Sequence, residues 1–177
     1  MTRKPRLLML SVLCAATLAA GLSACAPLVL GGAAMGTLVV IDRRTSGAQL
    51  EDEGIEFRSS NRLREALGDS AHVNITSYNR QVLLTGEVPN AQSRPLAEQI
   101  TGKVANVRAI VNELAVMGSA SLVQRSSDTL TTGKVKASLV DAKDLYASAF
   151  KVVTERGTVY LMGRVTQREA NRATEIT

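Results

Sequence analysis

The 177-residue chain contains few of the side chains that build most enzyme and metal sites. It has two cysteines, one histidine and no tryptophan, and aromatic residues make up only 3% of it, so its cores must be aliphatic. With a single histidine, His72, metal sites built from histidine and cysteine are excluded, as is most catalysis that depends on histidine. We therefore expect neither an enzyme nor a cofactor.

The first 25 residues carry an export signal. Arg3, Lys4 and Arg6 precede an apolar run over residues 7–20, and small residues then lead to Cys25. Basic residues, an apolar segment and a small-residue cleavage point are typical of a secretory signal peptide. The sequence Leu-Ser-Ala-Cys at the cleavage point is similar to a bacterial lipobox, which implies that Cys25 is acylated and becomes the first mature residue. The alternatives are an ordinary signal peptide that holds a cysteine, or a transmembrane helix, although a spanning helix needs about 20 apolar residues.

Removal of this signal changes the charge and the cysteine count. Three of the 21 basic residues leave with it, so 18 basic residues face 16 acidic ones, and nucleic acid is not an expected partner. Cys14 is also lost and Cys25 would carry lipid, so the mature chain cannot form a disulfide. Export without disulfides fits a periplasmic protein. By resemblance to sorted lipoproteins, Ala26 after the cysteine, rather than aspartate, implies the outer membrane.

From residue 55 onward the chain repeats itself. Residues 73–88 reappear in register as residues 150–165, with Gly86 opposite Gly163. Each copy predicts two short strands around a tight turn, at residues 78–81 and 155–158. We expect the two glycines to serve packing or a turn rather than a ligand.

Helices are predicted before and after each hairpin, at residues 55–67 and 128–140 ahead of the strands. Behind the second hairpin, Thr166 and Glu169 form a capping box. Residues 107–116 add a third strand to the first copy, and the second copy ends at Thr177 without a counterpart, which predicts a truncated second domain. The expected order is a signal peptide (1–24), acylated cysteine and tether (25–54), first domain (55–117), linker (118–127) and second domain (128–177). The apolar residues 26–41 either lie near the membrane surface or form a disordered tether.

These units resemble BON domains. The features that carry the resemblance are the strand that ends at Gly86, the helix behind it and the segment from Val104 to Asn112. Two such units behind a lipobox, with residues 42–47 ahead of the first, resemble the dual-BON-domain outer-membrane lipoproteins associated with division and outer-membrane stress. The resemblance implies an α+β fold of two tandem αββαβ domains, each with a three-stranded sheet packed on two helices, the second lacking its last strand here. It also implies a lipid-anchored place at the periplasmic face of the outer membrane, binding of anionic phospholipid, and no catalysis.

One position suggests where such binding occurs. If Leu63 corresponds to Val135, then Leu130 takes the place of Arg58, and it shares a helix face with Lys134 and Ala137. An apolar residue flanked by cations suits shallow insertion among anionic head groups, although a single exposed leucine is also ordinary. His72 is expected to be an exposed strand residue.

We therefore predict a lipid-anchored, periplasm-facing protein that binds an anionic phospholipid membrane through Leu130, Lys134 and Ala137 and supports envelope integrity. The alternative is a lipid-anchored scaffold that binds envelope proteins or peptidoglycan. The sequence does not give the oligomeric state.

Overall fold

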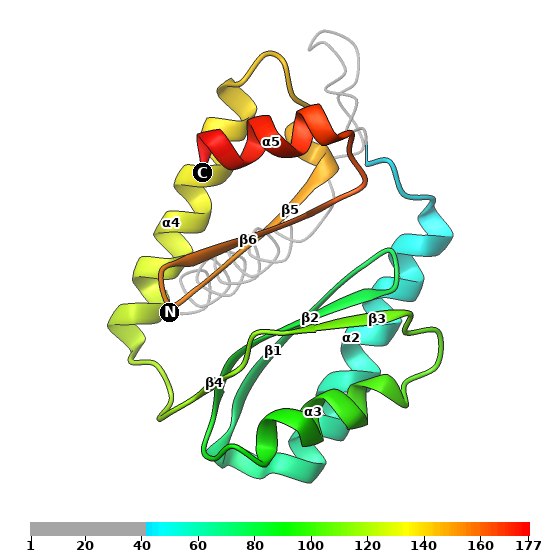
Figure 1. Cartoon of the computed structure of the whole chain (residues 1–177), viewed down its shortest axis with the longest axis vertical. Helices are drawn as coiled ribbons and strands as arrows, with labels where there is room; N and C mark the ends of the chain where they lie inside the picture. The colour runs from blue at the N-terminus through cyan, green and yellow to red at the C-terminus, as the bar shows by residue number, and fades with distance from the viewer. Residues whose placement is uncertain (1–41) are drawn as a thin grey trace, which may run out of the picture. The chain divides into compact units, whose positions relative to one another are not determined.

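The computed structural model describes residues 42–177 and contains two α+β domains (Figure 1). The first comprises α2 (Ser46–Leu67), η2 (Gly68–Ser70), β1 (His72–Tyr78), β2 (Gln81–Val88), α3 (Ser93–Gly102), β3 (Ala109–Asn112) and β4 (Ala115–Val116). The second comprises α4 (Leu122–Asp141), η3 (Ala147–Ala149), β5 (Phe150–Glu155), β6 (Thr158–Gly163) and α5 (Gln167–Ile176). The predicted α+β class and the repeated helix–strand–strand–helix order are confirmed.

The two sheets follow the predicted hairpins. In the first domain β1 and β2 are antiparallel, and β3 and β4 both pair with β2 in parallel. The predicted third strand is therefore two pieces, interrupted at Glu113 and Leu114. In the second domain β5 and β6 form an antiparallel pair.

Each hairpin turns through two residues with positive φ. The values are 52° and 67° at Asn79 and Arg80, and 52° and 77° at Arg156 and Gly157. Two consecutive positive φ angles match the right-handed twist of the flanking strands, which is why such turns suit tight hairpins.

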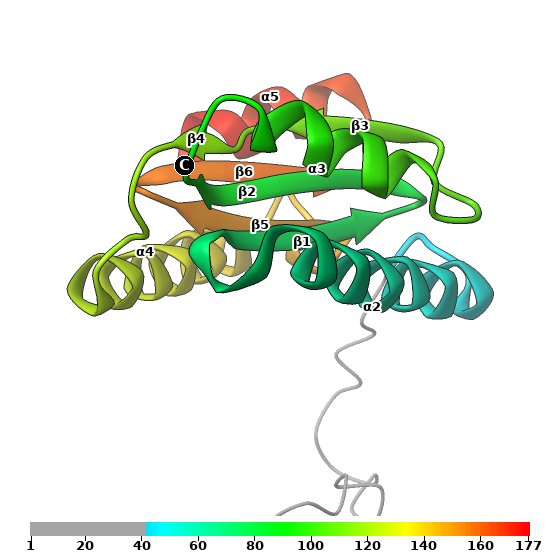
Figure 2. The same cartoon turned by 90° about the horizontal axis from the view of Figure 1, so that it is seen from below.

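Each domain has its own aliphatic core. The alternating residues Val82, Leu84 and Val88 of β2 lie on the face covered by α2 and α3, where they pack with Ile55 and Leu63 (Figure 2). In the second domain Val152 of β5 packs with Val135 and Leu139 of α4, and with Ala173 of α5. The alternation in the sequence therefore identified the buried face of each hairpin.

The long helices begin earlier than predicted. Helix α2 begins at Ser46 rather than Ile55, and the Thr45 side chain accepts a hydrogen bond from Ala48 N. Helix α4 begins at Leu122, capped by Ser121, so most of the linker predicted at 118–127 is helical. Apolar periodicity could not reveal these first turns because they bury almost no apolar side chains. The capping box of α5, between Thr166 and Glu169, is confirmed.

The helices also align differently from the predicted register. Asp52 of α2 accepts hydrogen bonds from the backbone N–H groups of Asn79 and Arg80, at 2.7 Å each. Asp128 of α4 does the same for Arg156 and Gly157, at 2.9 and 2.8 Å. Asp52 is therefore equivalent to Asp128, and Leu63 to Leu139.

This alignment lies one helical turn from the predicted one. Leu130 corresponds to Gly54, and Arg58 corresponds to Lys134, so the predicted pairing of Leu130 with Arg58 is wrong. Hydrophobic spacing repeats about once per turn, and it could not separate two registers that differ by one turn. The buried aspartate that holds each hairpin turn decides between them.

Candidate functional site

The predicted membrane-contact residues lie on the outward side of α4. The helix buries Asp128, Val135 and Leu139, and Leu130 on the opposite side is 67% exposed. Lys134 and Ala137 are exposed as well. The structure therefore places all three on one accessible helix face, while their role in binding stays a prediction.

The same face carries apolar residues that the sequence interpretation missed. Leu122 and Val123 are each 80% exposed, and Val140 is 69% exposed. Successive positions turn by about 100° around a helix, so Val123, Leu130 and Ala137 lie almost directly in line. Leu122 and Val123 were missed because residues 118–127 were assigned to a linker. Their apolar character next to Ser121, a good N-cap residue, was the available signal.

The charges on α4 are mostly basic near this row. Lys134 and Lys136 are exposed, and Lys143 follows the end of the helix. Asp141, also exposed, is the acidic residue of the last turn. The outward face of α4 therefore combines a row of exposed aliphatic side chains with flanking lysines.

Helix α2 differs from α4 at the equivalent positions. Arg58, the counterpart of Lys134, donates to Glu51 Oε1 at 2.8 Å. Where α4 has Leu130, α2 has Gly54. Exposed apolar residues do occur on α2, at Leu50 (71% exposed) and Phe57 (69%), so an exposed apolar side chain is not by itself particular to the second domain.

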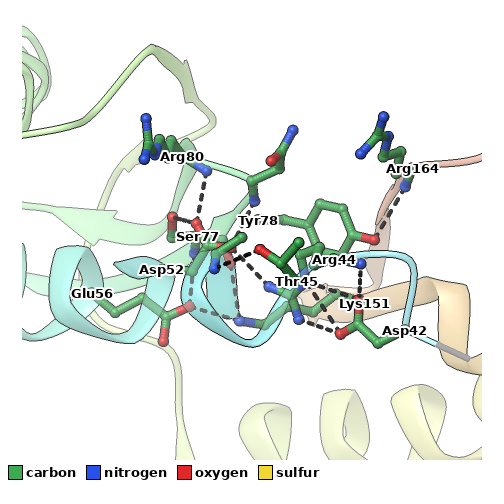
Figure 3. A network of polar contacts seen from close by, with 12 residues as sticks. Asp42, Arg44, Thr45, Asp52, Glu56, Ser77, Tyr78, Arg80, Lys151 and Arg164 are labelled. Carbon is green, nitrogen blue, oxygen red and sulfur yellow. Dashed lines mark hydrogen bonds and ion pairs between the residues drawn. The ribbon is translucent and has the colours of Figure 1, made fainter. Parts of the chain in front are cut away.

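A network of polar and charged side chains surrounds the segment from Asp42 to Thr45 (Figure 3). Arg44 bonds Asp42 at 2.8 Å and Asp52 at 2.9 Å, and its guanidinium lies 4.2 Å from the centre of the Tyr78 ring. Burial by itself would raise the pKa of Asp52, but hydrogen bonds from Arg80 N, Ser77 Oγ and other donors outweigh it and lower that pKa. The ionised carboxylate therefore joins this segment to the first hairpin.

Tyr78 and Lys151 connect the two domains in the same region. The Tyr78 hydroxyl accepts from Arg164 N at 3.2 Å and donates to Ala149 O at 3.4 Å. Lys151 of β5 donates to Glu56 Oε1 at 2.7 Å (Figure 3).

Arg43 adds a bond to the second domain. It reaches both carboxylate oxygens of Glu169, at 2.6 and 2.9 Å. The hydrogen bonds from Arg43, with those from Thr166, lower the pKa of Glu169 to about 2. The capping carboxylate of α5 is thus also an anchor for the segment that precedes α2.

His72 is not the freely exposed strand residue that the sequence predicted. Its ring is half-buried, and Nδ1 lies 3.2 Å from Glu87 Oε2 on the neighbouring strand. The even-numbered residues of β1 face away from the core of their own domain, and here Asn74 bonds Glu155 of the second domain. Alternation identified the core face of β1 but could not show that residues of the second domain contact the other face.

The comparison with protein families matches this architecture. The model described as BON domain matches residues 51–118 and 127–177. The chain belongs to the BON-domain family. Both BON domains have the paired strands and helices described above, and the resemblance seen in the sequence is confirmed.

Three relatives extend the comparison. Outer membrane lipoprotein DolP of Haemophilus influenzae is 37% identical over 157 residues, which cover 88% of this chain and 81% of that protein. The 21 kDa hemolysin of Actinobacillus pleuropneumoniae is 30% identical over 138 residues, covering 77% and 71%. An uncharacterized protein in the gshII 5′ region of Anaplasma centrale is 32% identical over 93 residues, covering 51% and 62%. None of these names denotes an enzyme.

The similarity to an outer-membrane lipoprotein agrees with the export signal. This BON-domain protein is an outer-membrane lipoprotein, held by a lipid anchor. Cys25 lies outside the described residues, so its acylation stays a prediction. Among residues 42–177, no helix has both the length and the apolarity needed to cross a bilayer.

Proposed function

We propose that this lipoprotein binds anionic phospholipid through the outward face of α4 and that this contact supports envelope integrity. The observation that carries the proposal is the row of exposed aliphatic side chains on α4, Val123, Leu130 and Ala137, flanked by Lys134 and Lys136. A helix of this kind suits the boundary between head groups and acyl chains, because its aliphatic side chains leave water while its cations stay among the phosphates.

The magnitudes allow a weak but measurable contact. Full burial of a leucine contributes about 1.5–3 kcal/mol, and each basic residue near an anionic surface contributes about 1 kcal/mol. A lipid-anchored protein already lies at the membrane, so a contact of this size can orient the second BON domain without having to recruit it.

The test is co-sedimentation of the unacylated chain, from residue 26 onward, with vesicles that contain an anionic phospholipid. Leu130→Glu should weaken binding about tenfold or more, because it removes inserted apolar area and adds a repelled charge. Lys134→Glu should weaken binding and reduce its dependence on salt. Vesicles of neutral lipid alone should bind poorly.

The matched control is Phe57→Glu, which makes the same kind of change at a similarly exposed position of α2. Arg58→Glu is a poorer control, because it would break the ion pair with Glu51. Circular dichroism should show each variant folded. Equal loss in Phe57→Glu and Leu130→Glu would contradict a site on α4.

The alternative function is a lipid-anchored scaffold for envelope proteins or peptidoglycan. The exposed Leu50 and Phe57 favour it, since they add exposed apolar side chains on α2 as well as on α4. If vesicle binding vanishes with the anchor, and none of the α4 substitutions matters, the scaffold function replaces phospholipid binding.

A further inference from the structure

Three potential metal ligands meet where the two BON domains touch. His72 of β1 and Glu87 of β2 are direct partners across the antiparallel pair, and Glu155 is the last residue of β5. One ligand atom from each of the three lies within 4.8 Å of the other two. Residues that are far apart in the sequence therefore offer one imidazole nitrogen and two carboxylates to the same point.

Both carboxylates are buried, and they are not equally compensated. Glu87 is 1% exposed and pairs with Arg156 Nη1 at 3.1 Å as well as with His72. Glu155 is 7% exposed, and its hydrogen-bond partner is the neutral Asn74 amide, at 2.6 Å. Two buried carboxylates this close together are unfavourable unless positive charge offsets them. Arg156 is paired with Glu87, so Glu155 is the less compensated of the two.

We propose that His72, Glu87 and Glu155 form a site for a divalent transition metal of the Zn²⁺ type that links the two BON domains. One imidazole with two carboxylates is a donor set that suits zinc and its neighbours, whereas Mg²⁺ and Ca²⁺ prefer oxygen ligands alone. Asn74 or water would complete the coordination.

The geometry needs little adjustment for such an ion. Ligand atoms about 2.1 Å from a tetrahedral zinc lie about 3.4 Å from one another. His72 Nδ1 and Glu87 Oε2 are already 3.2 Å apart, so the main movement required is that of the Glu155 carboxylate.

A cleft gives the ion a way in. It has a volume of about 240 Å³, and His72, Asn74 and Glu155 line it together with Asp128 and Arg125 of α4. Asp128 is already committed to the backbone N–H groups of the β5–β6 turn, so it is not counted as a ligand. Arg125 lines the same cleft. Its positive charge and that of Arg156 repel a cation and therefore weaken metal binding.

Substitution of Arg156 should change metal affinity in the direction opposite to substitution of a ligand. Its guanidinium competes with the metal for Glu87, and its side chain is 39% exposed, so it can move into solvent when the metal binds. Removal of that guanidinium should strengthen metal binding, while removal of a ligand should weaken it. General loosening of the domain contact would not give these opposite effects.

The experiment titrates Zn²⁺ into the acylated protein, purified in mild detergent without a histidine tag and freed of metal with a chelator. Competition with a chromophoric chelator gives the stoichiometry and affinity. We expect one Zn²⁺ per chain, little competition from excess Mg²⁺, and at least about tenfold weaker binding in His72→Ala and Glu155→Gln. Arg156→Gln should bind more tightly than the unaltered protein.

The matched control is Glu56→Gln, which removes the carboxylate of the Lys151–Glu56 ion pair between the domains but no proposed ligand. It should leave Zn²⁺ affinity within about twofold. Zn²⁺ binding that is unchanged in His72→Ala, or equally lost in Glu56→Gln, would overturn the proposal.

A second measurement needs no substitution at all. His72 is the single histidine of the chain, so its ring nitrogens give unambiguous NMR signals. One equivalent of Zn²⁺ should shift the Nδ1 signal, and because the chain has one histidine the shifted signal can be assigned to His72 directly. An unmoved Nδ1 signal at saturating Zn²⁺ would overturn the proposal even if every variant misfolded.

Discussion

Gly86→Ala should destabilise the first BON domain more than any other glycine-to-alanine change in the described residues. Gly86 has φ +106°, a region that L side chains rarely adopt. A Cβ built there would also overlap the carbonyl oxygen of His72 on β1, where the two strands pair. That atom belongs to the backbone, so it cannot turn away as a flexible side chain would.

Two costs add up at this position. An unfavourable φ costs about 1–3 kcal/mol, and forcing extra volume into a packed region costs about 1–3 kcal/mol more. The sum, about 2–6 kcal/mol, is large against the 5–15 kcal/mol that typically stabilises a domain. For a chain of this length, 1 kcal/mol corresponds to about 2–4 °C, so Tm should fall by about 4–24 °C.

Two other glycines calibrate the measurement. At Gly163 an added Cβ would lie 2.8 Å from Ala149 O, with no positive φ, so only the packing cost should appear. At Gly133, within α4, nothing lies within 4 Å, and alanine should stabilise the helix by about 0.5–1 kcal/mol. Urea unfolding followed by circular dichroism measures all three.

The expected order of destabilisation is Gly86→Ala, then Gly163→Ala, with Gly133→Ala slightly stabilising. The argument about Gly86 would be refuted if its alanine variant unfolded at the same urea concentration as Gly133→Ala.

Two further predictions concern the segment before α2 and the anchor. The pKa of Glu169 is held near 2, below its ordinary 4.5, so its stabilising effect is present above about pH 4.5 and is lost as the pH falls toward 2. Arg43→Gln should therefore flatten the acid decline of the urea midpoint, and an unchanged decline would contradict this role for the Arg43–Glu169 pair. Cys25→Ser should leave the protein soluble or with its signal uncleaved, because stable anchoring takes more than one acyl chain. Salt-resistant membrane association with normal processing of that variant would show that Cys25 is not the lipidated residue.

Local patterns were sufficient to predict each hairpin and its buried face. Strand alternation follows from the backbone, so Val82 and Leu84 had to lie on one side of β2 whatever surrounded them. The positive φ of the turns and the capping box of Thr166 and Glu169 are likewise properties of a few neighbouring residues. The export signal and the repeat were readable for the same reason.

Helix boundaries and register were harder to read. The first turns of α2 and α4 bury few apolar side chains, so hydrophobic spacing gave no signal there. The equivalence of Asp52 and Asp128 depends on hydrogen bonds to turns far along the chain. An aspartate at the same place before each hairpin was visible in the sequence, but its meaning required the fold.

The sequence by itself therefore determined the two repeated α+β units, their aliphatic cores and the outer-membrane anchoring signal, because these arise from periodicity and short motifs. Only the tertiary structure decided which distant residues contact the face of β1 that points away from its own core. It brought His72 and Glu87 against Glu155, Tyr78 against Arg164, and Arg43 against Glu169. These contacts join residues far apart in the chain, and no local pattern specifies which distant charge a buried polar group will meet.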